Sequence, residues 1–179
     1  MSQDVQVVCS CGAVAFALKG GPILAAECHC TSCRAAGERL EALPDAVAIR
    51  EPNGGTRFVL WRKDRVRPLR GTEHLRSFRL GPDAHTERVV AVCCQAPMYL
   101  TFKGGHWLSL YARRWPDGAA PPPELRTMTR DAPESLDLPD DIPNARTQTL
   151  GFFAKLLAAW ARMGFRNPVV VEVRERLDA

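Results

Sequence analysis

The residues best suited to chemistry in this sequence are its cysteines, which occur in clusters rather than singly. The densest stretch, ECHCTSC, covers residues 27–33 and contains three thiols. The full set is Cys9, Cys11, Cys28, Cys30, Cys33, Cys93 and Cys94. Thiols one or two residues apart suit a tetrahedral metal such as zinc, whose thiolate ligands lie about 2.3 Å from the ion. The spacing therefore predicts metal binding.

The alternatives to metal are disulfides or free thiols. The N-terminus has no basic region followed by an apolar run, so we expect no secretory signal. No stretch approaches the roughly 18 apolar residues of a membrane span. We therefore predict a cytoplasmic protein without a membrane segment, in which cysteines stay reduced. In that compartment clustered thiols indicate a metal, with free thiols as the alternative.

Residues 28–33 offer three ligands, Cys28, Cys30 and Cys33. The last two have the two-residue spacing of a zinc knuckle. Three protein ligands leave a fourth position for water or substrate, which is typical of a catalytic zinc. His29 would leave a strand on the opposite face from its neighbours, so we expect it not to be the fourth ligand.

Cys9 and Cys11 fall on one side of a predicted strand over residues 5–18, about 6.6 Å apart at the backbone. A local bend at Ser10 and Gly12 would bring their sulfurs closer together. The alternative is that the three cysteines of residues 28–33 join one of the distal pair in a single site. That arrangement would leave Cys9 and Cys11 without partners.

Residues 1–115 are predicted to form a domain of short strands separated by turns. Runs such as TRFVLW, TERVVAVCC and HWLSLYARR are bounded by glycine and proline, which favours an antiparallel sheet fold over alternating strand–helix units. A second strand is expected near residues 23–28, and a short helix over 33–40. The 46% hydrophobic content is enough for a core without structural disulfides.

Residues 116–179 differ in composition. Prolines and acidic residues predict an irregular surface segment up to residue 144. A helix is predicted over about 147–164, packing on the same domain, with a last strand near the C-terminus. Its predicted sheet-facing stripe is Leu150, Phe153, Leu157 and Trp160.

A net charge of +4 is compatible with an anionic small molecule but too small to indicate nucleic acid. Basic residues between 57 and 70 alternate with apolar ones, as in any half-exposed strand. We therefore predict neither a nucleic-acid nor a membrane partner. Oligomeric state is left open.

Three motifs, CSCGAVAFAL, CHCTSCRAAG and CCQAPMYL, resemble the glutathione-dependent formaldehyde-activating enzymes and their relatives. The resemblance covers about residues 7–113. It implies a mainly β protein, an Mss4-like β-tent of antiparallel sheets, to which the C-terminal helix is an addition.

The resemblance also implies one or two zinc ions. A structural zinc would be held by the positions matching Cys9, Cys11 and Cys94. The first cysteine of the family's distal pair falls at Ala91, and Cys93 is a candidate replacement. Neighbouring residues on a strand point to opposite faces, so Cys93 and Cys94 could both bind only with a distorted backbone.

By the same resemblance, Cys28, Cys30 and Cys33 are expected to form the catalytic zinc site, where a thiol such as glutathione reacts with formaldehyde. Arg34 is a candidate clamp for a carboxylate of glutathione. The chain would then be a carbon–sulfur lyase resembling S-hydroxymethylglutathione synthase. The alternative is a zinc-stabilised binding module that has lost the enzymatic role.

Overall fold

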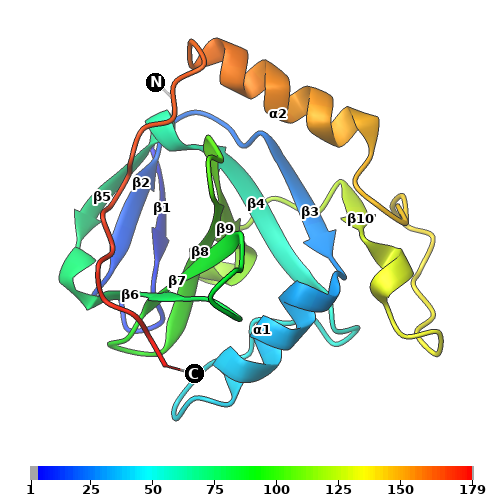
Figure 1. Ribbon diagram of the computed structural model, residues 1–179, viewed down its shortest axis with the longest axis horizontal. Coiled ribbons are helices and arrows are strands. Elements are labelled where there is room, and N and C mark those ends of the chain that lie inside the picture. The colour runs from blue at the N-terminus through cyan, green and yellow to red at the C-terminus, as the bar shows by residue number, and fades with distance from the viewer. Residues whose placement is uncertain (1–3, 179) are drawn as a thin grey trace.

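The computed structural model describes residues 4–178 and is mainly β, which confirms the predicted fold class (Figure 1). Its described part contains a three-stranded sheet of order β1-β2-β5 and a seven-stranded sheet of order β10-β3-β4-β9-β8-β7-β6. The strands are β1 (Val5–Val8), β2 (Ala15–Leu18), β3 (Leu24–Cys28), β4 (Thr56–Arg62), β5 (Val66–Arg70), β6 (Leu75–Phe78), β7 (Thr86–Ala91), β8 (Ala96–Phe102), β9 (Trp107–Tyr111) and β10 (Leu125–Thr127). The helices are α1 (Thr31–Glu41) and α2 (Leu150–Arg162).

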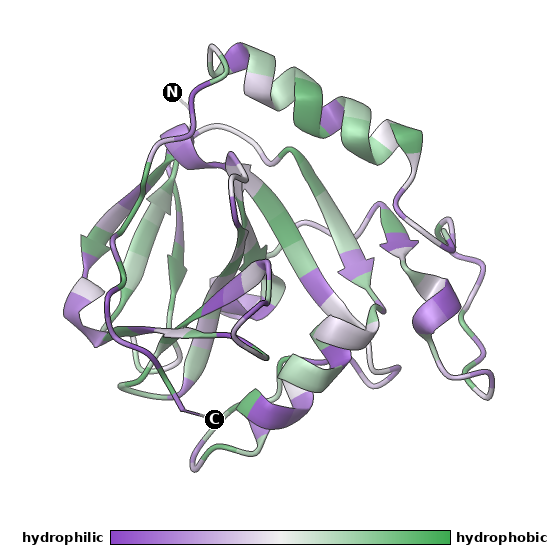
Figure 2. Ribbon diagram, in the orientation of Figure 1, coloured by the Kyte–Doolittle hydropathy of each residue, from purple (hydrophilic) through white to green (hydrophobic). Residues whose placement is uncertain are grey.

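The central strands of the large sheet are apolar on both faces, and other parts of the chain cover each face. In β4, Val59 and Trp61 belong to the core between the two sheets. Phe58 and Leu60 point the other way, into a second core that includes residues of both helices. This is the period-two alternation of a strand with two buried faces. Figure 2 shows apolar residues along β3, β4 and α2.

Three details of the predicted strands are wrong. The strand predicted over residues 5–18 is a hairpin of β1 and β2 around a tight turn. The segment predicted as a last strand forms only an isolated parallel bridge between Arg176 and Ser77. The segment predicted as irregular contains β10, which pairs with β3 in parallel, so the large sheet is not purely antiparallel.

Helix α2 begins with Thr149, whose hydroxyl accepts a hydrogen bond from the Phe152 N–H. The predicted sheet-facing stripe is wrong for three of its four residues, since Leu150, Phe153 and Leu157 are 89%, 55% and 57% exposed. The fourth residue, Trp160, is partly buried and stacks on His106. Leu156 and Ala159 are the buried residues of the helix. Because α2 is apolar around most of its circumference, its period cannot show which face is covered. No helix within residues 4–178 is long and apolar enough to cross a bilayer.

Candidate functional site

All seven thiols are free, and the structure gathers them into two separate groups. The first, called here the four-cysteine cluster, consists of Cys9, Cys11, Cys93 and Cys94. The second, the three-cysteine cluster, consists of Cys28, Cys30 and Cys33. Within each group the Sγ atoms lie within 4.8 Å of one another. Both groups can therefore hold a metal ion.

The four-cysteine cluster has the dimensions of a tetrahedral thiolate site. The Sγ atom of Cys9 lies 3.6 Å from that of Cys11 and 3.8 Å from that of Cys93, and the latter two are 3.5 Å apart. Four sulfurs at zinc–thiolate bond length around one ion lie about 3.8 Å from each other. The donor set therefore fits a closed structural zinc site.

The β1–β2 turn brings Cys9 and Cys11 together by a local bend. Gly12 has φ +76°, a left-handed conformation that glycine adopts without steric penalty. Its N–H donates to the Cys9 carbonyl at 3.0 Å, and the Val14 N–H donates to the Cys9 Sγ at 3.2 Å. Hydrogen bonding with the Ala13 backbone and with the Cys93 thiol lowers the pKa of Cys11 to about 7. The hydrogen bond to the Cys9 Sγ and the lowered pKa of Cys11 both favour thiolates in this turn.

Cys93 and Cys94 do not lie on a strand, contrary to prediction. Strand β7 ends at Ala91, and residues 92–95 form the turn into β8. The turn is closed by a hydrogen bond from the Cys94 N–H to the Ala91 carbonyl, and Gln95 has φ +51°. Alternation between sheet faces does not apply in such a turn. Both sulfurs can therefore face the same centre.

Arg114 is buried beside the four-cysteine cluster, and the sequence contained no signal for this. It is 3% exposed, and its Nη1 donates to the Ser10 hydroxyl at 3.0 Å. Burial lowers the pKa of Arg114, while nearby Cys94 and Cys9 favour its charged form. Four thiolates around a divalent ion carry a net negative charge. A buried guanidinium compensates that charge.

A substitution at Gly71 tests how the hairpin turn is supported. Gly71 has φ +75°, and a Cβ built there would lie 2.3 Å from the Ala13 carbonyl oxygen. We expect Gly71→Ala to destabilise the fold by at least about 2 kcal/mol, because it adds steric overlap to a strained φ. Denaturant unfolding measures this loss, with Gly20→Ala as the control. Gly20 also has positive φ but has open space around it, so equal losses would exclude an effect of the contact with Ala13.

The three-cysteine cluster is formed where β3 ends and α1 begins. Cys28 is the last residue of β3, and Cys30 is the N-cap of α1, with its Sγ accepting a hydrogen bond from the Cys33 N–H at 3.3 Å. The N-terminus of a helix stabilises negative charge. The predicted helix over 33–40 thus begins two residues earlier, and its first turn points at the cluster.

The three thiols cannot all ionise unaided. Hydrogen bonds from the Cys28 and Cys33 thiols lower the pKa of Cys30, and the Cys33 N–H and the Arg88 guanidinium act in the same direction. Hydrogen bonding with Cys30 raises the pKa of Cys28, and contact with both neighbours raises that of Cys33. Three crowded thiolates require a cation to neutralise their repulsion. Among the described residues no fourth cysteine, histidine or carboxylate joins them.

Arg88 is the main residue at this cluster that sequence analysis missed. It is 1% exposed, and its Nη2 donates to the Ser32 carbonyl and hydroxyl, each at 3.1 Å. Arg88 directly precedes the apolar run Val89–Ala91 in the sequence, and this position was a signal that the arginine is buried. Alternation places Arg88 on the same face as Val90. The sequence could not show that this face lies against the cysteines.

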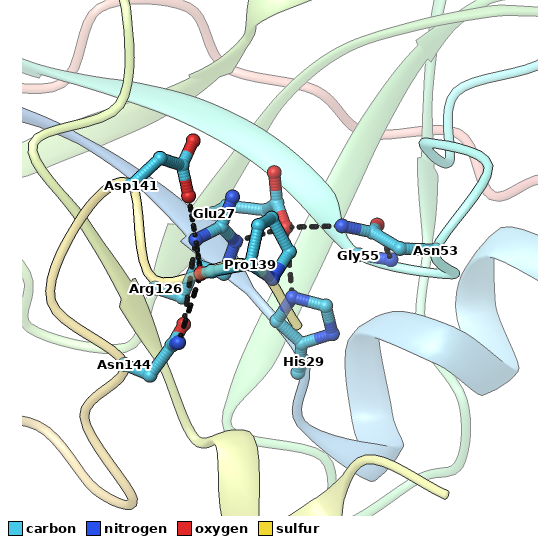
Figure 3. Close-up of polar contacts among 8 residues, drawn as sticks. All are labelled: Glu27, His29, Asn53, Gly55, Arg126, Pro139, Asp141 and Asn144. Carbon is cyan, nitrogen blue, oxygen red and sulfur yellow. Dashed lines mark hydrogen bonds and ion pairs between the residues drawn. The ribbon is translucent and has the colours of Figure 1, made fainter. Parts of the chain in front are cut away.

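His29 does not join the three-cysteine cluster and belongs instead to a buried polar network (Figure 3). It is fully buried, and its Nε2 is 2.8 Å from Glu27 Oε1. The same oxygen accepts hydrogen bonds from Asn53 at 2.8 Å and from Arg126 at 3.3 Å. Burial opposes ionisation of Glu27, but the hydrogen bonds from His29 and Asn53 outweigh it and lower its pKa. The network holds the backbone on both sides of Cys28.

Arg126 connects this network to the proline-rich segment. Its Nη1 donates to Asp141 at 2.7 Å and to the Pro139 carbonyl at 3.0 Å, as Figure 3 shows. The hydrogen bond to Asp141, together with the charge of Glu27, raises the pKa of Arg126. Residues 139–144 are thereby fastened to the end of β3. The predicted irregular segment is therefore part of the support for the three-cysteine cluster.

Arg34, the predicted carboxylate clamp, lies in α1 and donates from Nη1 to the Asp131 carbonyl at 2.6 Å. It does not line the cavity next to the cysteines, whereas Arg88 does. Its role as a clamp stays a prediction.

A cavity of about 400 Å³ opens beside the three-cysteine cluster and includes all three cysteines in its wall. Strands β4, β8 and β9 form one side, and α2 covers it. Helix α2 is held over the sheet by His106, whose Nε2 lies 2.9 Å from the Leu156 carbonyl oxygen. The ring of His106 stacks on Trp160, with centroids 5.4 Å apart. The arrangement can hold a small molecule next to a three-thiolate centre.

Comparison with known proteins agrees with the resemblance seen in the motifs. Residues 4–47 match the family model described as glutathione-dependent formaldehyde-activating enzyme, and this range contains the first five cysteines. No curated protein sequence matches the chain. A crystal structure of a Rhodobacter sphaeroides protein is similar, with 19% identity and a TM-score of 0.44. That match covers 63% of this chain and 88% of the other. The N-terminal quarter is thus similar in sequence to this family.

Proposed function

We propose that the protein is a cytoplasmic zinc protein that joins a thiol to a small aldehyde at the three-cysteine cluster. The observation that carries the proposal is the position of three Sγ atoms, within 4.8 Å of one another, in the wall of a ligand-sized cavity. Zinc held by Cys28, Cys30 and Cys33 would keep one ligand position for a substrate. The four-cysteine cluster would hold a second, structural zinc.

When bound, zinc would lower the pKa of a substrate thiol and so keep it as a thiolate at neutral pH. The thiol proton would pass to water, and a lone pair of the sulfur would form the carbon–sulfur bond with the aldehyde carbon. The electrons of the carbonyl π bond move to its oxygen, which takes a proton from water. The product is a hemithioacetal.

The protein's own part in this reaction is positioning. Three thiolates make zinc a weak Lewis acid, so the cavity wall has to hold the carbonyl carbon close to the sulfur. Arg88 keeps Ser32, and with it the first turn of α1, in place through its two hydrogen bonds. The match of residues 4–47 to the formaldehyde-activating family supports this class of reaction.

The proposal is tested by measuring chemical exchange between ¹³C-formaldehyde hydrate and its thiol adduct by NMR. We expect zinc-loaded protein to accelerate exchange with 2-mercaptoethanol above the rate in buffer. Cys30→Ser should abolish the acceleration, because it removes a ligand. Equal exchange rates for wild type, Cys30→Ser and buffer would overturn the proposal.

A second candidate function is a zinc-stabilised binding module without catalysis. It is favoured by one observation, the exposed apolar side of α2 at Leu150, Phe153 and Leu157. The same exchange measurement separates the two functions, since the binding module would show no acceleration although it binds zinc.

A further inference from the structure

We infer that the cavity beside the three-cysteine cluster selects a substrate with an apolar hydrocarbon chain, rather than a charged peptide such as glutathione. The inference rests on the proposed function, in which a thiol binds at this cluster. It narrows the substrate class to alkyl thiols, whose sulfur would meet the cluster while the chain fills the cavity.

The first reason is the chemistry of the wall. Most of the cavity surface is apolar, and much of it is provided by Phe58, Leu60, Leu100, Trp107 and Phe152. Polar side chains adjoin the cysteines, such as Ser32 between Cys30 and Cys33. A polar end next to a long apolar wall suits a ligand with one polar atom and a hydrocarbon chain.

The second reason is charge. Glutathione carries two carboxylates and one ammonium group at neutral pH. Among the residues lining the cavity, Arg88 is the only charged one, and it already donates to Ser32 and Thr86. A second carboxylate and the ammonium group would have no charged partner there. Burial of unpaired charges is strongly unfavourable, so the charged groups of glutathione would have to stay outside the apolar part of the cavity.

The third reason is helix α2, which covers the cavity. Helix α2 supplies Phe152, Phe153 and Leu156 to the cavity wall. Leu156 is 5% exposed, and its carbonyl contacts His106, so the cover is packed onto the sheet. The helix lies far outside residues 4–47, the part of the chain that matches the glutathione-dependent family. The part of the wall that α2 supplies is thus separate from the residues that match that family.

The test is a binding series with zinc-loaded protein. The probes are ethanethiol, 1-butanethiol, 1-hexanethiol and glutathione, with 1-butanol and 1-hexanol as matched ligands without sulfur. Calorimetry and tryptophan fluorescence report binding, since Trp107 lines the cavity. We expect affinity to rise about threefold to fourfold for each added methylene. 1-Hexanethiol should bind at least tenfold more tightly than glutathione.

Two variants test whether the chain occupies this cavity. Ala26 lines it and is 4% exposed, so Ala26→Leu should reduce its volume and weaken 1-hexanethiol binding about tenfold, with a smaller effect on ethanethiol. Phe152→Ala removes part of the wall and should flatten the dependence on chain length. Leu157→Ala, on the exposed side of α2, is the control and should leave the series unchanged.

The outcomes separate this inference from the proposed function. Affinity that does not rise with chain length, or glutathione bound more tightly than 1-hexanethiol, would overturn the inference and leave the zinc–thiol site intact. Alcohols that bind as tightly as thiols, with no effect of Cys30→Ser, would overturn the proposed function. If the affinity of the alcohols rises with their chain length, an apolar ligand for the cavity would still be supported.

Discussion

The Cys11→Ser variant is expected to lose one of two bound zinc ions and more than about 3 kcal/mol of stability. In the four-cysteine cluster the metal would tie the β1–β2 turn to the β7–β8 turn, which are about 80 residues apart in the chain. Structural zinc contributes its binding free energy directly to folding. Elemental mass spectrometry gives the metal content, and denaturant unfolding gives the stability.

Cys30→Ser is the matched control, because it makes the same chemical change in the other cluster. It should also lose one zinc ion, but with a smaller loss of stability, since the three-cysteine cluster joins residues of one short segment. Finding a single zinc ion, lost only with Cys11→Ser, would leave the three-cysteine cluster without metal. The proposed thiol chemistry would then be excluded.

Replacement of Arg126 by methionine is expected to destabilise the fold by about 3–5 kcal/mol, the usual effect of removing one partner from a buried ion pair. Arg126 and Glu27 side chains are both 6% exposed, with Nε and Oε1 3.3 Å apart. The variant leaves Glu27 ionised and buried without its cationic partner. Denaturant unfolding measures the loss, and hydrogen exchange should show residues 139–144 released from β10.

Arg174→Met is the control for this variant, because the Arg174–Glu172 pair is fully exposed. Its removal should change stability little, since exposed ion pairs are screened by water. If Arg126→Met and Arg174→Met have similar small effects, the network of Figure 3 does not support the three-cysteine cluster.

Local features of the sequence were sufficient to find the thiols that could bind a metal. Cys30 and Cys33 are close because a helix start brings residues three apart together, whatever the rest of the chain does. Ser10 and Gly12 indicated a bend between Cys9 and Cys11, and Gly12 has the positive φ that such a bend requires. The turn signals between the strands likewise indicated a mainly β fold.

The predictions from sequence were wrong where the structure depends on packing rather than on local spacing. The VVAVCC run reads as one strand, and only the pairing of β7 with β8 shows that it ends at Ala91. Helix α2 is apolar on several sides, so its sequence is compatible with either face against the sheet. The structure buries Leu156 and Ala159 and leaves Leu157 outside.

The sequence by itself determined that seven thiols lie in short patterns that could bind a metal, within a β-rich chain, because spacings of one to three residues are set by the local backbone. Only the tertiary structure decided which clusters combine, where Arg88 and Arg114 are buried, and that α2 closes an apolar cavity over three cysteines. Those relations join residues that are far apart in the chain, such as Arg88 with Ser32, Arg114 with Ser10, and Leu156 with Cys28. They depend on how the sheets and helices pack, which no local pattern encodes.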